Sequence, residues 1–248
     1  MRVRRSPCEP TAAQREQHEA EGHTNYRSWC WACVSARGRS GPHFAGSGDP
    51  EQAAKISFDF CYLAPRHEES SPILVSVVNL TGKVSAHVLP SKGVTPFNID
   101  LFAKLLQRAN FTDLEVQTDG EPAMTSLRDR GMALERTRYG INLTLLGTVE
   151  YDHQGNGAVE VAVREVKAQS RTLKIALEGK LGVELPSDSG ILVWLVTFAA
   201  DMITRCRVGR DGKTAWMRMR HKAYDKSFPL FGERVWWMPV QDRAMTGS

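Results

Sequence analysis

Residues 73–89 read ILVSVVNLTGKVSAHVL, two short segments rich in β-branched residues on either side of a Thr81-Gly82 pair. β-Branched side chains favour strands, and a glycine-containing turn between two such segments predicts a β-hairpin. A third strand-like segment, KISFDFCYL at residues 55–63, precedes this pair. We therefore expect the fold to begin with three consecutive strands.

Beyond the hairpin, helix-like and strand-like segments alternate. The predicted elements are a helix opened by Pro96, a strand at 114–118, a helix around 122–136, a strand at 141–146 and a helix from about 158 to 180. The order β-β-β-α-β-α-β-α predicts an α/β fold with a mixed five-stranded sheet flanked by helices. This order is the one found in ribonuclease H-like folds, although other α/β domains come close to it.

Composition excludes several classes of protein. The chain has 248 residues, of which 42% are hydrophobic and 24% charged, with a formal net charge of +4. These fractions are typical of globular proteins, not of disordered or fibrous chains. We expect no secretory signal and no membrane span, because the longest apolar run, residues 191–200, is shorter than the roughly 20 residues that a span needs. We expect that run to form a buried helix. The five cysteines favour a reduced, intracellular compartment over a disulfide scaffold.

The composition also divides the chain into four predicted regions. Residues 1–45 are polar and rich in Cys and His, and a Gly/Pro/Ser-rich linker follows at 46–53. Residues 54–183 hold the alternating elements, and 184–248 form a helical and basic C-terminal extension. Within that extension, eight Lys or Arg and two Asp lie between residues 205 and 226. Either a second contact with nucleic acid or a solvated basic helix explains this excess.

Three carboxylates lie at the element ends where chemistry is expected in such a sheet. Asp59 lies inside the first strand, Asp119 ends the fourth, and Glu160 lies in the first turn of the last helix. If they converge, they need a counter-charge, and two Mg²⁺ or Mn²⁺ ions supply one in phosphodiester displacement. The structural alternatives are a turn former for Asp119 and a helix-start charge for Glu160. Asp59 is harder to explain structurally, because burying an unpaired carboxylate is costly.

The last predicted helix carries a basic row on the face of Glu160. At 100° per residue, four basic side chains fall within about 40° of Glu160. They are Arg164, Lys167, Arg171 and Lys174. Apolar residues collect on another face, which we expect to pack on the sheet. A basic row behind a metal site suits a phosphate backbone, and a solvated helix face is the alternative.

A second set of ligand-type residues lies in the N-terminal region. Two imidazoles and two thiolates fall within 16 residues: His18, His23, Cys30 and Cys33. The Cys-x2-Cys spacing lets one tight turn present both sulfurs, and the set is complete for tetrahedral Zn²⁺. One zinc ion would supply much of the folding free energy of so short and polar a segment. Cys8 and His43 are less well spaced stand-in ligands, and two unrelated reduced thiols are the alternative.

Taken in order, these motifs resemble the integrase region of copia-type long-terminal-repeat retrotransposon Pol polyproteins. HEAEGHTNYRSWCWACVSARGRSGPH at 18–43 resembles the zinc-binding pre-integrase segment. Three further segments resemble the three blocks of the integrase catalytic core: SFDFCYL at 57–63, VQTDGEPA at 116–123 and GNGAVEVAVREVKAQSRTLK at 155–174. GRDGKTAWMRMRHKAYDKSFPLFGERVWW at 209–237 resembles the segment after the core. One departure is the loop EYDHQGNG at 150–157, where His153 stands in place of the usual Ser-, Pro- and Gln-rich sequence.

The resemblance implies an integrase, a DNA strand transferase that trims 3′ ends and joins element DNA to target DNA. It implies that Asp59, Asp119 and Glu160 hold two Mg²⁺ or Mn²⁺ ions. It implies one structural Zn²⁺ on His18, His23, Cys30 and Cys33, and it places Asn156 near the DNA. The implied partners are double-stranded DNA and further copies of the chain, in the nucleus or in a cytoplasmic particle before import. Two alternatives stay open: a catalytically inactive or co-opted nucleic-acid-binding relic of a retroelement, and a nuclease that cuts without joining.

Overall fold

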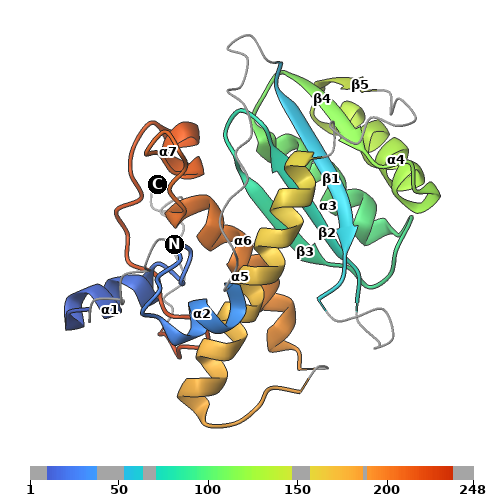
Figure 1. Cartoon of the computed structure of the whole chain (residues 1–248). Helices are drawn as coiled ribbons and strands as arrows, with labels where there is room; N and C mark the ends of the chain where they lie inside the picture. Colours follow the sequence, from blue (N-terminus) through green and yellow to red (C-terminus); the bar gives the residue numbers. More distant parts are fainter. Residues whose placement is uncertain (1–9, 38–52, 64–70, 147–156, 187–188, 237–248) are drawn as a thin grey trace, which may run out of the picture.

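The computed structural model describes residues 10–37, 53–63, 71–146, 157–186 and 189–236. In this part of the chain five strands form one mixed sheet (Figure 1). They are β1 (Lys55–Cys61), β2 (Ile73–Val78), β3 (Val84–Val88), β4 (Asp113–Thr118) and β5 (Asn142–Leu145). Their order is β3-β2-β1-β4-β5, with β1–β2 and β2–β3 antiparallel and β1–β4 and β4–β5 parallel. The ribonuclease H-like arrangement predicted from the element order is thereby confirmed.

The described residues also form helices α1 (Ala12–Ala20), α2 (Trp31–Arg37), α3 (Pro96–Ala109), α4 (Pro122–Arg138), α5 (Gly157–Leu181), α6 (Ile191–Cys206) and α7 (Ala215–Arg220). Of these, α3 and α4 cover one face of the sheet and α5 and α6 the other. α3 begins where the sequence predicts, because Thr95 caps it and Pro96 fits its first position. It ends at Asn110, which takes a left-handed conformation.

The face covered by α3 and α4 holds the larger core. There the rings of Phe58 on β1 and Phe102 on α3 stack with centroids 4.1 Å apart. Gly131 of α4 lies directly over Phe102, and a Cβ at that position would come within 2.5 Å of the ring. The glycine is therefore required for the close approach of α4 to α3.

α5 and α6 cover the opposite face. Val159, Ala162 and Val166 of α5 are buried there beside Val196 and Ala200 of α6. The apolar face predicted for the last core helix is thus confirmed. The expectation of a buried helix at 191–200 holds for one face only. The other face of α6 leaves Val193 and Trp194 exposed, because α6 is a surface layer over the sheet.

α6 also protects the β3 edge of the sheet. The Thr204 hydroxyl accepts a hydrogen bond from the Val84 N–H at 3.1 Å and donates one to the Val84 carbonyl at 2.9 Å. The Thr197 hydroxyl donates to the Ala86 carbonyl at 3.2 Å. These side chains take the place of a further strand. α6 therefore shares a core with the sheet although it lies beyond the predicted boundary at residue 183, and the division into domains stays a prediction.

The N-terminal segment packs on α5, far along the chain from it (Figure 1). Cys30, Ala32 and Cys33 lie against Ile175 and Ala176 of α5. Within the described residues, no helix has the length and apolarity to span a membrane.

Candidate functional site

The parallel pairing of β1 with β4 sets Asp59 and Asp119 at the same level of the sheet. The last pair in the β1–β4 register is Phe58 with Thr118. Asp59 and Asp119 each follow that pair by one residue, so their side chains leave adjacent strands on the same face. Asp119 lies directly after β4, at the carboxyl end of a parallel strand, which is where open α/β sheets carry ligands.

Glu160 lies in the first turn of α5, which packs on β1 and β2. Its negative charge acts on Asp59. Burial raises the pKa of the Asp59 carboxyl to about 6, the charge of Asp119 adds to the rise, and Glu160 and Glu121 contribute less. Three acids therefore share one electrostatic environment that favours a positive charge.

Asp119 shows the same need for a cation. Burial raises the pKa of its carboxyl, with the charge of Glu121 next, and Lys92 opposes the rise. One buried oxygen of this carboxylate, Oδ1, has no hydrogen-bond partner among the described residues. The nearby Lys92 is already engaged, because its Nζ lies 2.7 Å from Glu121 Oε1 and over the rings of Phe60 and Tyr62.

These observations fit a divalent cation held by carboxylates, since hard oxygen donors suit Mg²⁺ or Mn²⁺. The oxygens of Asp59, Asp119 and Glu160 do not, however, form a compact ligand set. In the described ranges, the group of His, Cys, Asp or Glu close enough to share one ion is the N-terminal one. Asn156 and His153 lie outside the described residues, as do Cys8 and His43.

The raised pKa of Asp59 predicts a pH-dependent stability difference. The unfolded carboxyl titrates near its ordinary value of 3.8 and the folded one near 6, so the ionised form destabilises the fold above about pH 6. Asp59→Asn should therefore be more stable than the wild type at pH 7 in Mg²⁺-free buffer. That difference should shrink as the pH falls to 5, because the wild-type carboxyl then takes up its proton. Thermal unfolding of both proteins at the two pH values measures it, and a difference that stays constant would contradict the raised pKa of Asp59.

The four N-terminal residues meet in one buried cluster. Cys30 Sγ lies 3.4 Å from His23 Nδ1, Cys33 Sγ lies 3.3 Å from His18 Nε2, and those two nitrogens are 3.1 Å apart. All four ligand atoms lie within 4.8 Å of one another. Ligands on a tetrahedral zinc ion, at bond lengths of 2.0–2.3 Å, are separated by about 3.3–3.8 Å. The cluster therefore has the dimensions of a Zn²⁺ site.

Local backbone geometry explains how the cluster closes. His18 lies in the last turn of α1, and the chain reverses through Gly22 and His23, both with positive φ. Gly22 also contacts Met202 of α6, and a Cβ there would lie 2.7 Å from its Cγ. The Gly22 carbonyl accepts a hydrogen bond from Gln169 of α5. The reversal that forms the cluster is thus the same feature that docks it on the core.

The chemistry of the cluster agrees with its geometry. A hydrogen bond from Cys33 lowers the pKa of the Cys30 thiol, and hydrogen bonds from His18 and His23 lower it further, against the effect of burial. A thiolate is the form of cysteine that binds zinc. The residues present therefore fit the zinc ion that the sequence predicts.

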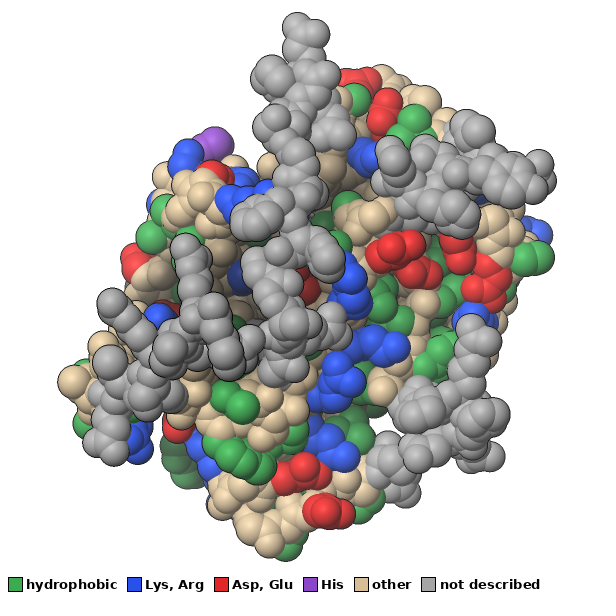
Figure 2. Space-filling view, viewed as in Figure 1, with side chains coloured by type: hydrophobic (Ala, Val, Ile, Leu, Met, Phe, Trp, Pro, Cys, Tyr) green, Lys and Arg blue, Asp and Glu red, His purple; other side chains and the backbone are tan. Residues whose placement is uncertain are grey.

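The predicted basic row follows the accessible side of α5. Arg164 and Arg171 are exposed, and Lys167 and Lys174 are half-buried. Lys174 pairs with Glu178 at 3.6 Å, whereas the other three form no ion pair with any described residue. Figure 2 shows Lys and Arg side chains in a line over α5 and acidic side chains gathered near its N-terminal end. The surface thus presents acids at one end and unpaired positive charge behind them.

Sequence reasoning missed three residues of this region. Glu121 and Lys92 modify the field at Asp119, and Gln169 joins α5 to the N-terminal segment. The position of Glu121, two residues after Asp119 in the same loop, was an available signal. Lys92 comes from the loop before α3, and nothing in its local sequence marks it.

No protein-family model matches the sequence, and no curated protein matches it. Among solved structures, the chain is similar to the catalytic core domain of BIV integrase, with 23% identity, a TM-score of 0.42, and coverage of 65% of this chain and 90% of that one. It is also similar to the HTLV-2 integrase catalytic core domain in complex with magnesium. The trimeric form shows 18% identity and a TM-score of 0.43, with coverage of 66% of this chain and 93% of that one. The dimeric form shows 17% identity and a TM-score of 0.43, with coverage of 68% of this chain and 95% of that one.

Proposed function

We propose that this protein is a metal-dependent polynucleotidyl transferase of the integrase type, acting on double-stranded DNA. The observation that carries the proposal is the β1–β4 register, which sets Asp59 beside Asp119 while the charge of Glu160 acts on Asp59. The motif order along the chain and the basic row on α5 support it. In this reading the protein trims DNA 3′ ends and joins them to target DNA.

The acids have one role in this reaction, which is to hold two divalent ions. Asp59, Asp119 and Glu160 would bind Mg²⁺ or Mn²⁺, which when bound activates an attacking oxygen and stabilises the leaving one. Lys92 pairs with Glu121 and offsets part of the negative charge that Glu121 adds at Asp119. The basic row then provides a path for the phosphate backbone that leads to them.

The zinc cluster has a structural role in this proposal. It would fix α1 and α2 against α5, the helix that carries both Glu160 and the basic row. A homo-oligomer and a nuclear location, or a cytoplasmic particle before import, complete the proposal. No membrane partner belongs to it.

A supercoiled plasmid assay tests the function. The zinc-loaded chain is incubated with plasmid in Mn²⁺ or in Mg²⁺- and Mn²⁺-free buffer, and a labelled 3′-hydroxyl oligonucleotide is added to detect joining. Metal-dependent nicking with joined product is expected. Nicking without joining would indicate a nuclease, and metal-independent DNA binding without nicking would indicate a nucleic-acid-binding relic.

The basic row yields a separate prediction about DNA affinity. The double variant Arg164→Ala/Arg171→Ala should weaken DNA binding and reduce the slope of log K against log salt by about 2, because each phosphate contact contributes about 0.9. Arg15→Ala/Arg130→Ala, which removes two exposed arginines from α1 and α4, is the matched control. Fluorescence anisotropy over a salt series gives both slopes. Equal slopes for the two variants would show that α5 is only a solvated helix face.

A further inference from the structure

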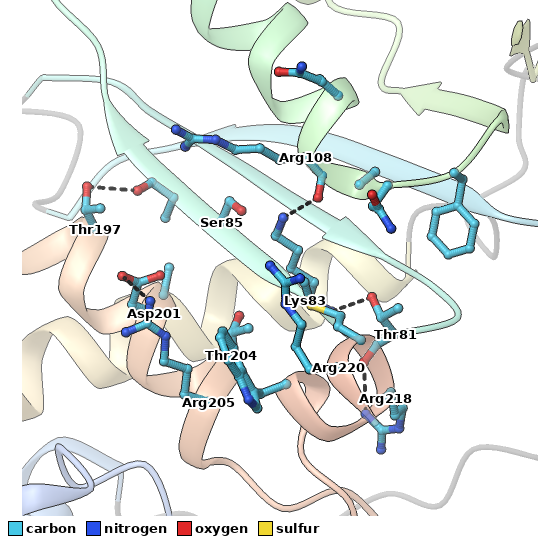
Figure 3. Close-up of a pocket in the computed structure, with 18 of the residues that line it drawn as sticks. Thr81, Lys83, Ser85, Arg108, Thr197, Asp201, Thr204, Arg205, Arg218 and Arg220 are labelled. Atoms are coloured by element: carbon cyan, nitrogen blue, oxygen red, sulfur yellow. Dashed lines mark hydrogen bonds and ion pairs between the residues drawn. The ribbon is translucent and has the colours of Figure 1, made fainter. Parts of the chain in front are cut away.

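A second charged site lies at the other edge of the sheet. A cavity of about 610 Å³ opens beside β3, two strands away from β1, and is closed in by α6, α7 and the end of α3 (Figure 3). Small-molecule sites typically enclose about 300–1,000 Å³. The cavity is therefore large enough for a ligand of its own, and neither the acids nor the zinc cluster takes part in it.

The edge strand directs polar side chains into this space. Lys83, Ser85 and His87 alternate along the chain and so share one face of the strand, opposite the buried Val84 and Ala86. Lys83 Nζ donates a hydrogen bond to the Arg108 carbonyl at 2.5 Å. Figure 3 shows the side chains of Arg108 and Arg220 reaching toward Ser85 and Lys83 from two sides.

The lining is strongly and asymmetrically charged. Five Lys or Arg and two His line the cavity, against one acid in the described residues, Asp201. Asp201 pairs with Arg205 at 3.7 Å, and Arg218 is paired with Asp211 outside the lining. Lys83, Arg108 and Arg220 form no ion pair within the described ranges. Three cations thus face one space in which the carboxylate of the described lining, Asp201, is paired with another residue, Arg205.

The pKa values of two groups in the cavity are lowered. Burial lowers the pKa of Lys83 to about 8, and the charges of Arg108 and Arg220 contribute to the fall. Burial also lowers the pKa of His87, again with a contribution from Arg108, and the charge of Asp201 opposes the fall in both pKa values. A negatively charged ligand would relieve the repulsion among these groups.

The surrounding structure holds two further cations of the lining, Arg205 and Arg218, in place. The Arg205 guanidinium lies 5.5, 5.3 and 4.6 Å from the ring centroids of Trp216, Tyr224 and Phe228. Arg218 Nη1 donates to the Thr81 carbonyl at 3.0 Å, which ties α7 to the β2–β3 turn. Arg220 projects from the last turn of the helix that is fixed in this way. Lys83, which is held by its hydrogen bond to the Arg108 carbonyl, therefore loses less entropy when the site binds an anion than the exposed Arg108 and Arg220 side chains do.

We propose that this cavity binds a small anion carrying several phosphate groups. Cations from β3, α3 and α7 surround the space, so a ligand with negative oxygens on several sides is favoured over a monoanion. Guanidinium groups match phosphate oxygens by paired hydrogen bonds, and the Ser85 hydroxyl lines the same space. The proposal does not depend on the function proposed above, because no acid of the β1–β4 edge takes part.

Calorimetric titration with inorganic tripolyphosphate tests the site in the full, zinc-loaded chain, in Mg²⁺-free buffer at constant ionic strength. One saturable site per chain is expected. Arg108→Ala/Arg220→Ala, which removes two exposed side chains, should weaken binding about a hundredfold, since each lost charge-assisted hydrogen bond costs about a factor of ten. Arg108→Lys/Arg220→Lys should retain part of the affinity. Arg164→Ala/Arg171→Ala, which removes the same charge from α5, and Asp59→Asn should bind as the wild type does.

The outcomes are distinct. Absence of saturable binding, or an equal loss in the α5 variant, would overturn the proposal. The proposal would also be overturned if a short DNA duplex displaced tripolyphosphate and the cavity variant lost DNA binding. The cavity would then be part of a DNA-binding surface. Repeating the titration with ATP separates the two sources of such a ligand. Tighter binding of ATP points to a nucleotide, and equal binding points to the phosphate chain alone; both support the site. Unchanged thermal unfolding of each variant shows that it is folded.

Discussion

Asp119→Asn should reduce Mn²⁺-dependent plasmid nicking by about a hundredfold or more. The substitution keeps the shape of the side chain and removes the negative charge that would hold the ion, and a bound metal supplies several kcal/mol of transition-state stabilisation. Asp119 Oδ1 is buried and has no hydrogen-bond partner among the described residues. The substitution therefore breaks no described hydrogen bond at that atom. DNA binding in Mg²⁺-free buffer should be unaffected, since the basic row is unchanged.

Glu121→Gln is the matched control for this experiment. Glu121 lies two residues away in the same loop and is engaged by Lys92, so its loss should change nicking only modestly. The quantities to compare are initial nicking rates at equal protein and Mn²⁺ concentrations. Full activity in Asp119→Asn would refute the assignment of the acids. An equal loss in both variants would show that the charge of the whole loop matters, not that of the one residue.

Cys33→Ser should release the zinc ion and unfold the N-terminal segment. Cys33 is fully buried and in contact with His18, and structural zinc in small modules contributes about 10–16 kcal/mol of apparent binding free energy. Residues 10–37 have little apolar core besides the contact with Ile175 and Ala176, so the segment has no substitute for that free energy. Limited proteolysis should then cut this segment in the variant and spare it in the wild type. Zinc content should fall from about one ion per chain to near zero.

Cys206→Ser provides the comparison. This thiol is free and half-buried at the end of α6, and it takes no part in the cluster. The variant should keep its zinc and its resistance to protease. If Cys33→Ser keeps one zinc per chain, the cluster is not the binding site; if it loses zinc but stays resistant, packing on α5 alone is sufficient to fold the segment.

The helices and strands were predictable because their signals are local. β-Branched runs separated by Thr81-Gly82 specify a hairpin whatever surrounds them, and Thr95 with Pro96 specifies the start of α3. The strand order followed from the sequence of elements, because few connections between them are allowed. The spacing of the Cys-x2-Cys pair and the nearby histidines predicted a shared cluster, since one tight turn can present both sulfurs to the same ion.

The surroundings of those residues depended on contacts between distant segments. Lys92 reaches Glu121 from a different loop, and Gln169 reaches the Gly22 carbonyl from the middle of α5. The basic cavity needs Lys83, Arg108 and Arg220, which come from three elements and share no local motif. No periodicity in the sequence encodes such pairs.

The element order, the candidate acids, the candidate zinc ligands and the basic row of α5 were predictable from the sequence, because their signals are residue types, short spacings and local periodicity. That Asp59 and Asp119 lie at one level of the sheet, and that the N-terminal cluster docks on α5, became visible in the tertiary structure. The same structure shows that α6 covers the β3 edge and that unpaired cations collect beside it. These features are set by strand register and by packing between side chains that are far apart in the chain. Local propensity does not specify which distant side chains come into contact.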